Sequence, residues 1–366
     1  MYGFVSHQSA CEALRRHIGD LPRWPESPRV LPIWGDCVSS QKKFRKWSSE
    51  IDLAAYGLTS PVDLIVPSES FRSRGKGAKF HVWKHSLPPH SMIRANKTLL
   101  ISGPELVLIQ LAGYQLKLAP VIDDYAKRIH ADQDVLDAAG VDEYVLYDDP
   151  IALERMRRQV DLVCQAMEFM GTYRMSSGDQ ETRYLQPALT TLESINAVMA
   201  ETPKALGCKR LQAALDMAFE RSASPMETAL ALMLTLPTEY GGFGLPKPKL
   251  NVQKDVHDSG LVPPERKAIT PDLLWEDGHV ALEYDSDEFH SLNDSAQLAR
   301  DAFRSNVLTA LGYRTLRATT DMVKRLYSLE LLAKHLAVVL GQDFQEPTPL
   351  LRQRRMRLHA YLLNKR

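Results

Sequence analysis

The alternation of apolar and polar positions is most regular in the last third of the chain, from Gly207 onward. Apolar residues at helical spacing follow Gly207, and a second helix is expected after Ser224, where Pro225 and Glu227 are typical of a first helical turn. Expected strands then cover Leu250 to Val256, Ile269 to Trp275, His279 to Tyr284 and Tyr313 to Ala318, and expected helices cover Asn293 to Leu311 and Met322 to Leu340. This order predicts a mixed sheet with helices on both faces.

The first 120 residues predict a separate α+β domain. Expected helices cover Ser9 to His17 and Ser102 to Leu118, and expected strands cover Pro61 to Pro67 and Lys79 to Trp83. The stretch after it is predicted to be mainly helical. We therefore expect four parts: a basic N-terminal domain at 1–120, a helical connecting region at 121–206 that is acidic at its start, a mixed α/β domain at 207–342, and a basic tail at 343–366.

Composition excludes several classes of protein. The 366 residues suffice for two domains, and 44% hydrophobic with 25% charged residues exclude a disordered or fibrous chain. Lys plus Arg and Asp plus Glu both number 45, which excludes a uniformly basic protein that coats DNA. The four cysteines lie far apart without a CxxC pair, so we expect reduced thiols. Without a signal-like start or an uninterrupted apolar span, we expect a cytoplasmic protein with no membrane partner.

The balance of charge changes along the chain. Residues 1–120 hold 16 Lys/Arg against 9 Asp/Glu, whereas residues 121–160 hold 5 against 10. The basic residues gather in three clusters: Lys42, Lys43, Arg45 and Lys46; Arg72, Arg74, Lys76 and Lys79; and the last sixteen residues. Such clusters attract phosphate backbones, although any one of them is also explained as a solvated surface.

Four acidic residues fall where the predicted sheet would bring them together. Asp272 lies in one strand of the expected hairpin, Glu283 and Asp285 end the other, and Glu227 starts the preceding helix. Neighbouring hairpin strands place Asp272 beside Glu283, and residues two apart in a strand share a face. Crowded carboxylates repel each other unless a hard cation lies between them, and Mg²⁺ prefers oxygen ligands. Such a metal activates water and stabilises charge on phosphate oxygens.

Each of these acids also has a simpler explanation. Glu227, three residues after Ser224, fits a helix capping box, in which its carboxylate accepts a hydrogen bond from the cap residue. Asp285 suits a turn. Glu283 is harder to explain in this way, because it ends the buried-type run 280–282, where an acid without a partner is costly.

The last third also carries a series of short motifs. They are Pro271-Asp272, Glu283-Tyr284-Asp285, His290, Arg300-Asp301, Arg304 and Leu311-Gly312-Tyr313-Arg314, preceded by the Ser224-Pro225-Met226-Glu227 helix start. In this order they resemble the Vsr-like endonuclease branch of the PD-(D/E)XK nuclease superfamily. The resemblance covers about residues 207–342 and implies a restriction-endonuclease-like core within an α/β fold, with a mixed sheet flanked by helices.

The resemblance implies a site for Mg²⁺, with Mn²⁺ able to substitute. Asp272, Glu283 and Asp285 would lie at the metal, and Glu227 would complete the catalytic set. The chain departs from the family at Asp285, where the superfamily usually has a lysine that orients the attacking water. An aspartate at this position would act only as a base or through a second metal.

Three further residues of the resemblance are candidates for contact with nucleic acid. They are His290, Arg300 and Arg304. A lone histidine is as often structural, and two arginines one helical turn apart also pair with surface acids.

The N-terminal region is similar, more weakly, to proteins of the type IV antitoxin AbiEi family. The similarity rests on Ser6-His7-Gln8-Ser9-Ala10, the stretch Pro61 to Ser68 with the basic loop after it, His81 to Pro89, and the helix start at Ser102-Gly103-Pro104. It implies a DNA-binding front, and Arg72, Arg74, Lys76 and Lys79 are then the candidate contacts. His81, His85 and His90 lack a supporting cysteine or helical histidine pair and are interpreted as strand and loop residues.

Together these features favour a metal-dependent endonuclease that hydrolyses DNA phosphodiester bonds. The resemblance suggests a role in phage defence or in a toxin–antitoxin-like system. The alternative is a catalytically inactive DNA-binding regulator or antitoxin with a decayed nuclease fold, which the missing lysine favours. A third hypothesis is a subunit of a larger defence complex, with the acidic stretch from Asp123 to Asp149 as the surface for a protein partner.

Overall fold

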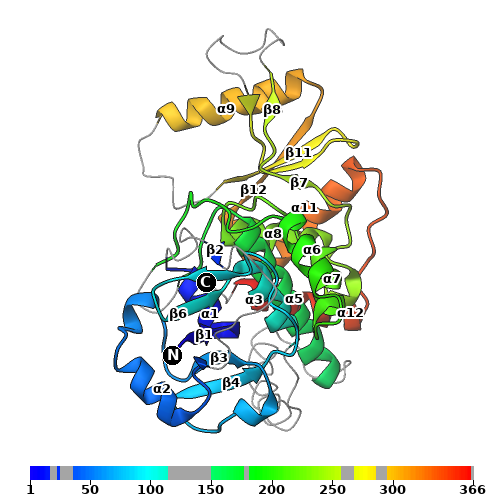
Figure 1. Cartoon of the computed structure of the whole chain (residues 1–366). Helices are drawn as coiled ribbons and strands as arrows, with labels where there is room; N and C mark the ends of the chain where they lie inside the picture. The colour runs from blue at the N-terminus through cyan, green and yellow to red at the C-terminus, as the bar shows by residue number, and fades with distance from the viewer. Residues whose placement is uncertain are drawn as a thin grey trace. The chain divides into compact units, whose positions relative to one another are not determined.

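The computed structural model describes residues 1–16, 23–24, 36–113, 150–176, 181–256, 268–285 and 295–363, and only the backbone at 23–24, 150 and 295–302 (Figure 1). Contacts between Cα atoms divide the chain into two units, which are described separately. The N-terminal unit comprises residues 1–116 and 159–218, and the C-terminal unit comprises residues 117–158 and 219–366. The division falls within helix α5 (Pro150–Met170).

These units differ from the ranges expected from the sequence, with boundaries at 120, 206 and 342, for reasons of packing. Helices α6 (Leu192–Glu201) and α7 (Cys208–Leu215) both contact α3 (Pro104–Ala112), which assigns them to the N-terminal unit. Helix α12 (Pro349–Leu363) packs against α8 (Pro225–Thr235), so the expected basic tail belongs to the C-terminal unit.

A six-stranded sheet forms the centre of the N-terminal unit. Its strands are β1 (Gly3–Val5), β2 (Arg23–Trp24), β3 (Val62–Val66), β4 (Ala78–Val82), β5 (Met92–Arg94) and β6 (Leu99–Ser102), in the order β2-β5-β6-β1-β3-β4. Strands β1, β3 and β6 are buried along their whole length, as their apolar runs require. Strand β1 pairs in parallel with β6 and antiparallel with β3, which makes the sheet mixed.

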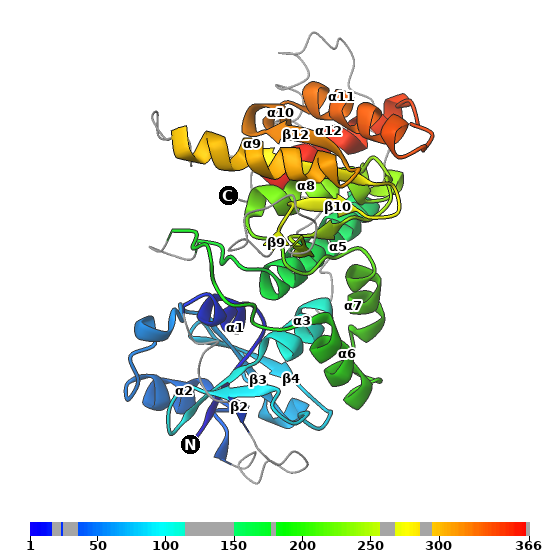
Figure 2. The same ribbon diagram turned by 90° about the horizontal axis from the view of Figure 1, so that it is seen from above.

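Helices lie against this sheet (Figure 2). Helix α1 (His7–Leu14) contacts β3, β6 and α3, and it begins two residues before the predicted Ser9. The remaining short elements are α2 (Gln41–Ser48) and the 3₁₀ helices η3 (Ala54–Tyr56) and η4 (Glu69–Phe71). Helix α3 is described to Ala112, and the rest of the helix predicted to Leu118 lies outside the described residues, as does most of the connecting region.

Two histidines of the N-terminal unit, His7 and His81, lie together beside the buried Asp63. His81 lies in β4, and its Nε2 is 2.8 Å from Oδ1 of Asp63. The ring of His7 stacks on that of His81 with centroids 3.8 Å apart. His85 and His90 lie in the loop before β5. The interpretation of these histidines as strand and loop residues is consistent with these positions.

The sheet of the C-terminal unit has the predicted mixed arrangement. Strands β7 (Lys249–Leu250), β10 (Leu273–Trp275) and β11 (Val280–Asp285) are antiparallel, and β12 (Arg314–Thr319) pairs with β11 in parallel, giving the order β12-β11-β10-β7. Parallel pairing requires a crossover, which α9 (Ser295–Ala310) provides between β11 and β12. Both units therefore combine helices with mixed sheets, and the predicted α/β class is confirmed at this level.

Two predicted strands are each broken into two. In place of 250–256 the chain forms β7 and β8 (Lys254–Asp255), because Asn251 between them has φ 48°, which an extended strand does not allow. In place of 269–275 it forms β9 (Ala268–Ile269) and β10, interrupted at Pro271, which has no N–H for a strand ladder. Strands β8 and β9 pair as a separate ribbon. The predicted last helix is likewise two helices, α10 (Thr320–Lys324) and α11 (Leu326–Val339).

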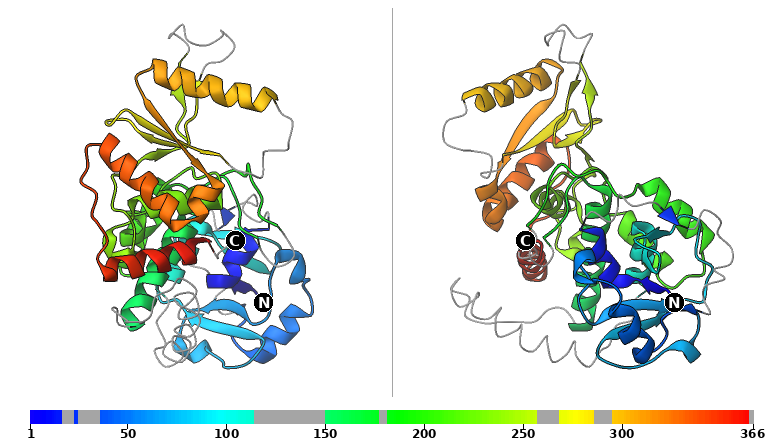
Figure 3. Two further views of the ribbon diagram at one scale, coloured as in Figure 1. Left: turned by 180° about the vertical axis from the view of Figure 1, so that it is seen from behind. Right: turned by 60° about the vertical axis from the view of Figure 1, so that its left-hand side comes forward.

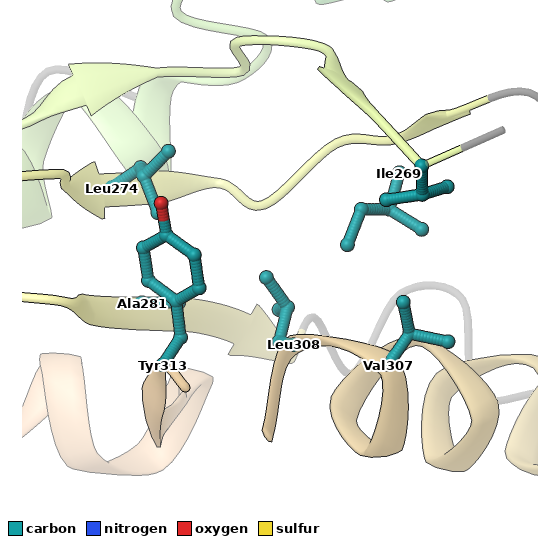
Figure 4. Close-up of a cluster of buried hydrophobic side chains, with 7 residues drawn as sticks. Ile269, Leu274, Ala281, Val307, Leu308 and Tyr313 are labelled. Carbon is teal, nitrogen blue, oxygen red and sulfur yellow. The ribbon is translucent and has the colours of Figure 1, made fainter. Parts of the chain in front are cut away.

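Helices cover both faces of the four-stranded sheet. Helix α9 lies on one face, and α8 and α11 lie on the other (Figures 1 and 3). On the α9 side, Val307 and Leu308 pack against Leu274 and Ala281 of the hairpin (Figure 4). Tyr313, at the end of the crossover, closes the same cluster. Side chains along β10 and β11 point alternately to the two faces of the sheet, and one set of them packs against α9.

Helix α12 packs against α8 in the C-terminal unit. Every residue of α8 from Met226 to Leu234 is buried. Arg355 of α12 is only 1% exposed, and its guanidinium lies over the rings of Phe243 and Phe344, at 4.7 and 5.3 Å from their centroids. It also pairs with Glu330 of α11 at 2.7 Å. The segment expected to be a solvated basic tail is therefore in part a packing element. No described helix is long and apolar enough to cross a membrane.

Candidate functional site

The β10–β11 hairpin positions two of the predicted acids. Leu273 pairs with Leu282 across the ladder, so the preceding Asp272 stands next to Glu283. The backbone N–H of Tyr284 donates a hydrogen bond of 2.7 Å to Oδ2 of Asp272. This bond fixes the Asp272 carboxylate at the end of β11, where the strand leaves the core.

Glu227 occupies the first turn of α8 and forms a capping box with Ser224. Its N–H donates to Oγ of Ser224 at 3.0 Å, and that hydroxyl donates to Oε1 of Glu227 at 3.2 Å. The N–H of Ala223 donates to Oε2 at 3.0 Å. The simpler explanation of Glu227 as a cap is thus realised, because its carboxylate accepts hydrogen bonds from the N–H of Ala223 and the hydroxyl of Ser224 at the helix start.

Glu227 also has an electrostatic relation to Asp272. Burial, and then the negative charge of Asp272, raise the pKa of Glu227 to about 7 from an ordinary value of 4.5. Hydrogen bonds from Ala223, Asn251 and Ser224 oppose this shift without offsetting it. The two carboxylates therefore repel each other when both are ionised. A cation bound between them would be favoured, because it would reduce this repulsion.

Asn251 is a site residue that the sequence analysis missed. Its Nδ2 donates to Oε2 of Glu227 at 2.7 Å and to the carbonyl of Arg221 at 2.9 Å, while its N–H donates to the carbonyl of Asp272 at 3.0 Å. It thereby joins the start of α8 to the start of β10. Asparagine tolerates a left-handed backbone better than most residues, and an asparagine directly after the apolar Leu250 is the signal that indicates a turn here.

Arginines hold the other two acids. Glu283 is 3% exposed, and its Oε2 lies 2.7 Å from Nη2 of Arg304 on α9. Asp285 accepts a hydrogen bond of 3.2 Å from Nη1 of Arg317 on β12. Of the two explanations for Arg304, the structure shows pairing with an acid. Arg317 was not anticipated, because only the register of β12 along β11 brings it to this edge.

Other candidate residues lie elsewhere or beyond description. His290 lies outside the described residues, and of Arg300 only the backbone, within α9, is described. The remaining candidates, Arg72, Arg74, Lys76 and Lys79, are exposed residues of the N-terminal unit, in and after the loop that follows η4. The site in the C-terminal unit therefore consists of Glu227, Asn251, Asp272, Glu283 and Asp285, with Arg304 and Arg317 bound to two of the acids.

The carboxylate oxygens of this site are ligands that suit a hard cation. Two of the four carboxylates form ion pairs with arginine. Glu227 and Asp272 supply carboxylate oxygens. Burial raises the pKa of Glu227, and the charge of Asp272 raises it further; a divalent ion would relieve this repulsion between the two carboxylates. Glu283 and Asp285 are engaged by arginines, and across the described ranges no three His, Cys, Asp or Glu side chains are grouped to hold a metal. A metal that used all four acids would have to share or displace those arginines.

Comparison of the chain with protein-family models, with curated proteins and with solved structures gives no match.

Proposed function

We propose that the C-terminal unit is a metal-dependent nuclease that hydrolyses DNA phosphodiester bonds. The observation that carries the proposal is that Asp272, directly before β10, lies beside Glu283 of β11, and that burial and the charge of Asp272 raise the pKa of Glu227. The order of helix, three antiparallel strands, crossover helix and parallel strand supports the resemblance to the PD-(D/E)XK superfamily and its Vsr-like branch. That resemblance also supports a role in phage defence or a toxin–antitoxin-like system.

The residues divide the work according to their surroundings. Asp272 and Glu283 would hold Mg²⁺, or Mn²⁺ in its place, with Glu227 and Asp285 beside them. When bound, the metal supplies an acidified water and neutralises charge on the phosphate. Asp285 is more exposed than Glu283, with 19% of its side chain open against 4%, and it is suited to accept a proton from an attacking water. Arg304 keeps a positive charge at the buried Glu283.

A second function is favoured by a specific observation. Both acids of β11 are already paired with arginines, and the position usually held by lysine is Asp285. A regulator or antitoxin that keeps the fold without the chemistry would retain such pairs as structural contacts. This alternative predicts DNA binding that needs no metal and that tolerates loss of the carboxylates.

A cleavage assay separates the two functions. The full chain is incubated with supercoiled, linear and single-stranded DNA and with RNA, in Mg²⁺, Mn²⁺ or EDTA. The test variant is Asp272→Asn/Glu283→Gln, and the matched control is Glu239→Gln/Asp343→Asn, two exposed acids of the same unit without ion pairs to described residues. We expect metal-dependent cleavage by the wild type and the control, and none by the test variant. Cleavage that survives in the test variant refutes the assignment, and absence of cleavage with binding retained in EDTA supports the regulator.

A further inference from the structure

Two basic clusters that are separate in the sequence are brought together in the N-terminal unit. The loop between η4 and β4 runs directly against α2, since a Cβ at Gly75 would lie 2.5 Å from the side chain of Gln41 and one at Gly77 would lie 2.9 Å from the ring of Phe44. The side-chain amide of Gln41 links α2 to the end of this loop. Its Nε2 donates to the carbonyl of Ala78 at 2.8 Å, and its Oε1 accepts from the N–H of Ala78 at 3.3 Å.

The cationic residues of both segments are exposed, although the ammonium of Lys43 also donates a hydrogen bond of 3.2 Å to Oγ of Ser39. All eight are exposed: Lys42, Lys43, Arg45 and Lys46 of α2, and Arg72, Arg74, Lys76 and Lys79 of the loop and β4. We call these eight residues the basic face. Among the described residues, Arg72 forms an ion pair with Glu69 at 3.5 Å, and both are well exposed, so this pair is weak. The charge of Lys79 also acts on Asp63, whose pKa it helps to lower. The basic face thus presents most of its charge without local neutralisation.

The apolar side of α2 fixes this presentation. Phe44 and Trp47 are 4% and 1% exposed and anchor the helix to the unit. Lys42 is consequently held one turn from Arg45 and Lys46, and like charges at this spacing destabilise a helix. An anionic partner would relieve that repulsion, whereas an ordinary solvated surface gains nothing from concentrating it.

The same anchoring indicates the class of partner. Proteins that bind single strands combine positive charge with exposed aromatic rings on which bases stack. Here the rings of Phe44, Trp47 and Phe80 are buried, and Phe71 is half-buried. A surface of long, exposed cations that has no exposed aromatic ring among the residues just named is suited to the regularly spaced phosphates of a duplex.

We propose that the basic face binds the phosphate backbone of double-stranded DNA without reading its sequence. The assignment joins the α2 cluster to the loop as one binding surface, with Gln41 as the residue that positions the loop on the helix. It stands apart from the proposed nuclease chemistry, because none of its residues belongs to the carboxylate site and binding needs no metal.

Binding is measured by fluorescence anisotropy of a labelled duplex in EDTA, with the full chain, over a series of salt concentrations. Three variants remove charge: Lys42→Gln/Lys46→Gln in α2, Arg74→Gln/Lys76→Gln in the loop, and the four changes combined. The control is Lys204→Gln/Lys209→Gln, two exposed lysines of the same unit. A fifth variant, Gln41→Leu, removes the two hydrogen bonds between Gln41 and Ala78 without changing the net charge.

We expect each double variant to weaken binding and to lower the slope of log K against log salt by up to about 0.9 per cation removed. The combined variant should lose at least about tenfold in affinity at moderate salt, and the control should match the wild type. Gln41→Leu should lower the slope although net charge is unchanged. Equal losses in the control, unchanged slopes in the charge variants, or variant-sensitive binding confined to single strands, duplex RNA or an acidic peptide would each overturn the proposal. EDTA keeps this result independent of the cleavage assay.

Discussion

Replacing Glu227 by glutamine should remove part of the pH dependence of the free energy of unfolding that the wild-type protein shows. Glutamine has the shape of a protonated glutamate, so its oxygen still accepts from Ala223 and Asn251 while its amide donates to Ser224. The capping box is preserved, and only the capacity to ionise is lost. The comparison therefore isolates the free energy of placing a negative charge on Glu227 beside Asp272.

The magnitude follows from the pKa. Burial and the charge of Asp272 raise the pKa of Glu227 from 4.5 to about 7, so the folded protein holds this proton more tightly than the unfolded chain does. The stabilisation is complete below pH 4.5, declines as the pH rises, and is lost above about pH 7. Between pH 4 and pH 8, this difference between the pKa values of the folded and unfolded protein lowers the free energy of unfolding of the wild type by about 3 kcal/mol. We expect Glu227→Gln to gain this amount relative to wild type over that range.

The assay is urea unfolding of both proteins from pH 4 to pH 8, with the protonated carboxyl band followed by infrared difference spectroscopy. Glu239→Gln, at an exposed acid, serves as the control and should show no such trend. Asp272→Asn removes the neighbouring charge and should lower the pKa of Glu227, which flattens the curve. A stability difference between wild type and Glu227→Gln that stays constant with pH would refute the reasoning.

Three further outcomes are expected from the structure. Arg355→Ala should destabilise the C-terminal unit by about 3 kcal/mol in chemical denaturation, because it removes a buried guanidinium and leaves Glu330 without its partner. Ser224→Ala removes the N-cap of α8 and should cost about 1 kcal/mol, and a change below a few tenths would contradict the capping geometry. Burial opposes ionisation of Asp63, but the hydrogen bond and charge of His81 lower its pKa overall, so Asp63→Asn should be less stable at neutral pH, with the deficit shrinking as the pH falls below about 4. Thermal unfolding at several pH values checks this last outcome.

Local patterns were sufficient to predict the framework of the C-terminal unit. The apolar run at 280–282, the turn after Trp275 and the start signal at Ser224 each act within a few residues, and the strands and helix appear where they indicate. The hairpin register that places Asp272 next to Glu283 follows from such short-range information. Chemistry that depends on neighbours along one hairpin is therefore readable from the sequence.

Contacts between distant residues were not readable in this way. Arg317 reaches Asp285 only through the register of a parallel pair formed across α9. Arg355 belongs to a run of basic residues that predicts a solvated tail, and its burial depends on Phe243 and Glu330, which come much earlier in the chain. Desolvating an arginine is unfavourable until such partners are assembled, and no local pattern reports their assembly.

The closure of α8 by α12 has a consequence for synthesis of the protein. Helix α8 emerges from the ribosome well before residues 349–363, and during that interval its apolar residues lack their final cover. The β11–β12 pairing likewise waits for α9 and β12. A chain that ends prematurely before Pro349 would leave Phe243 without the guanidinium that covers it and α8 without its neighbour. Such a product would expose apolar surface of the kind that proteases and chaperones recognise, so residues 349–363 are needed before the core around α8 is covered.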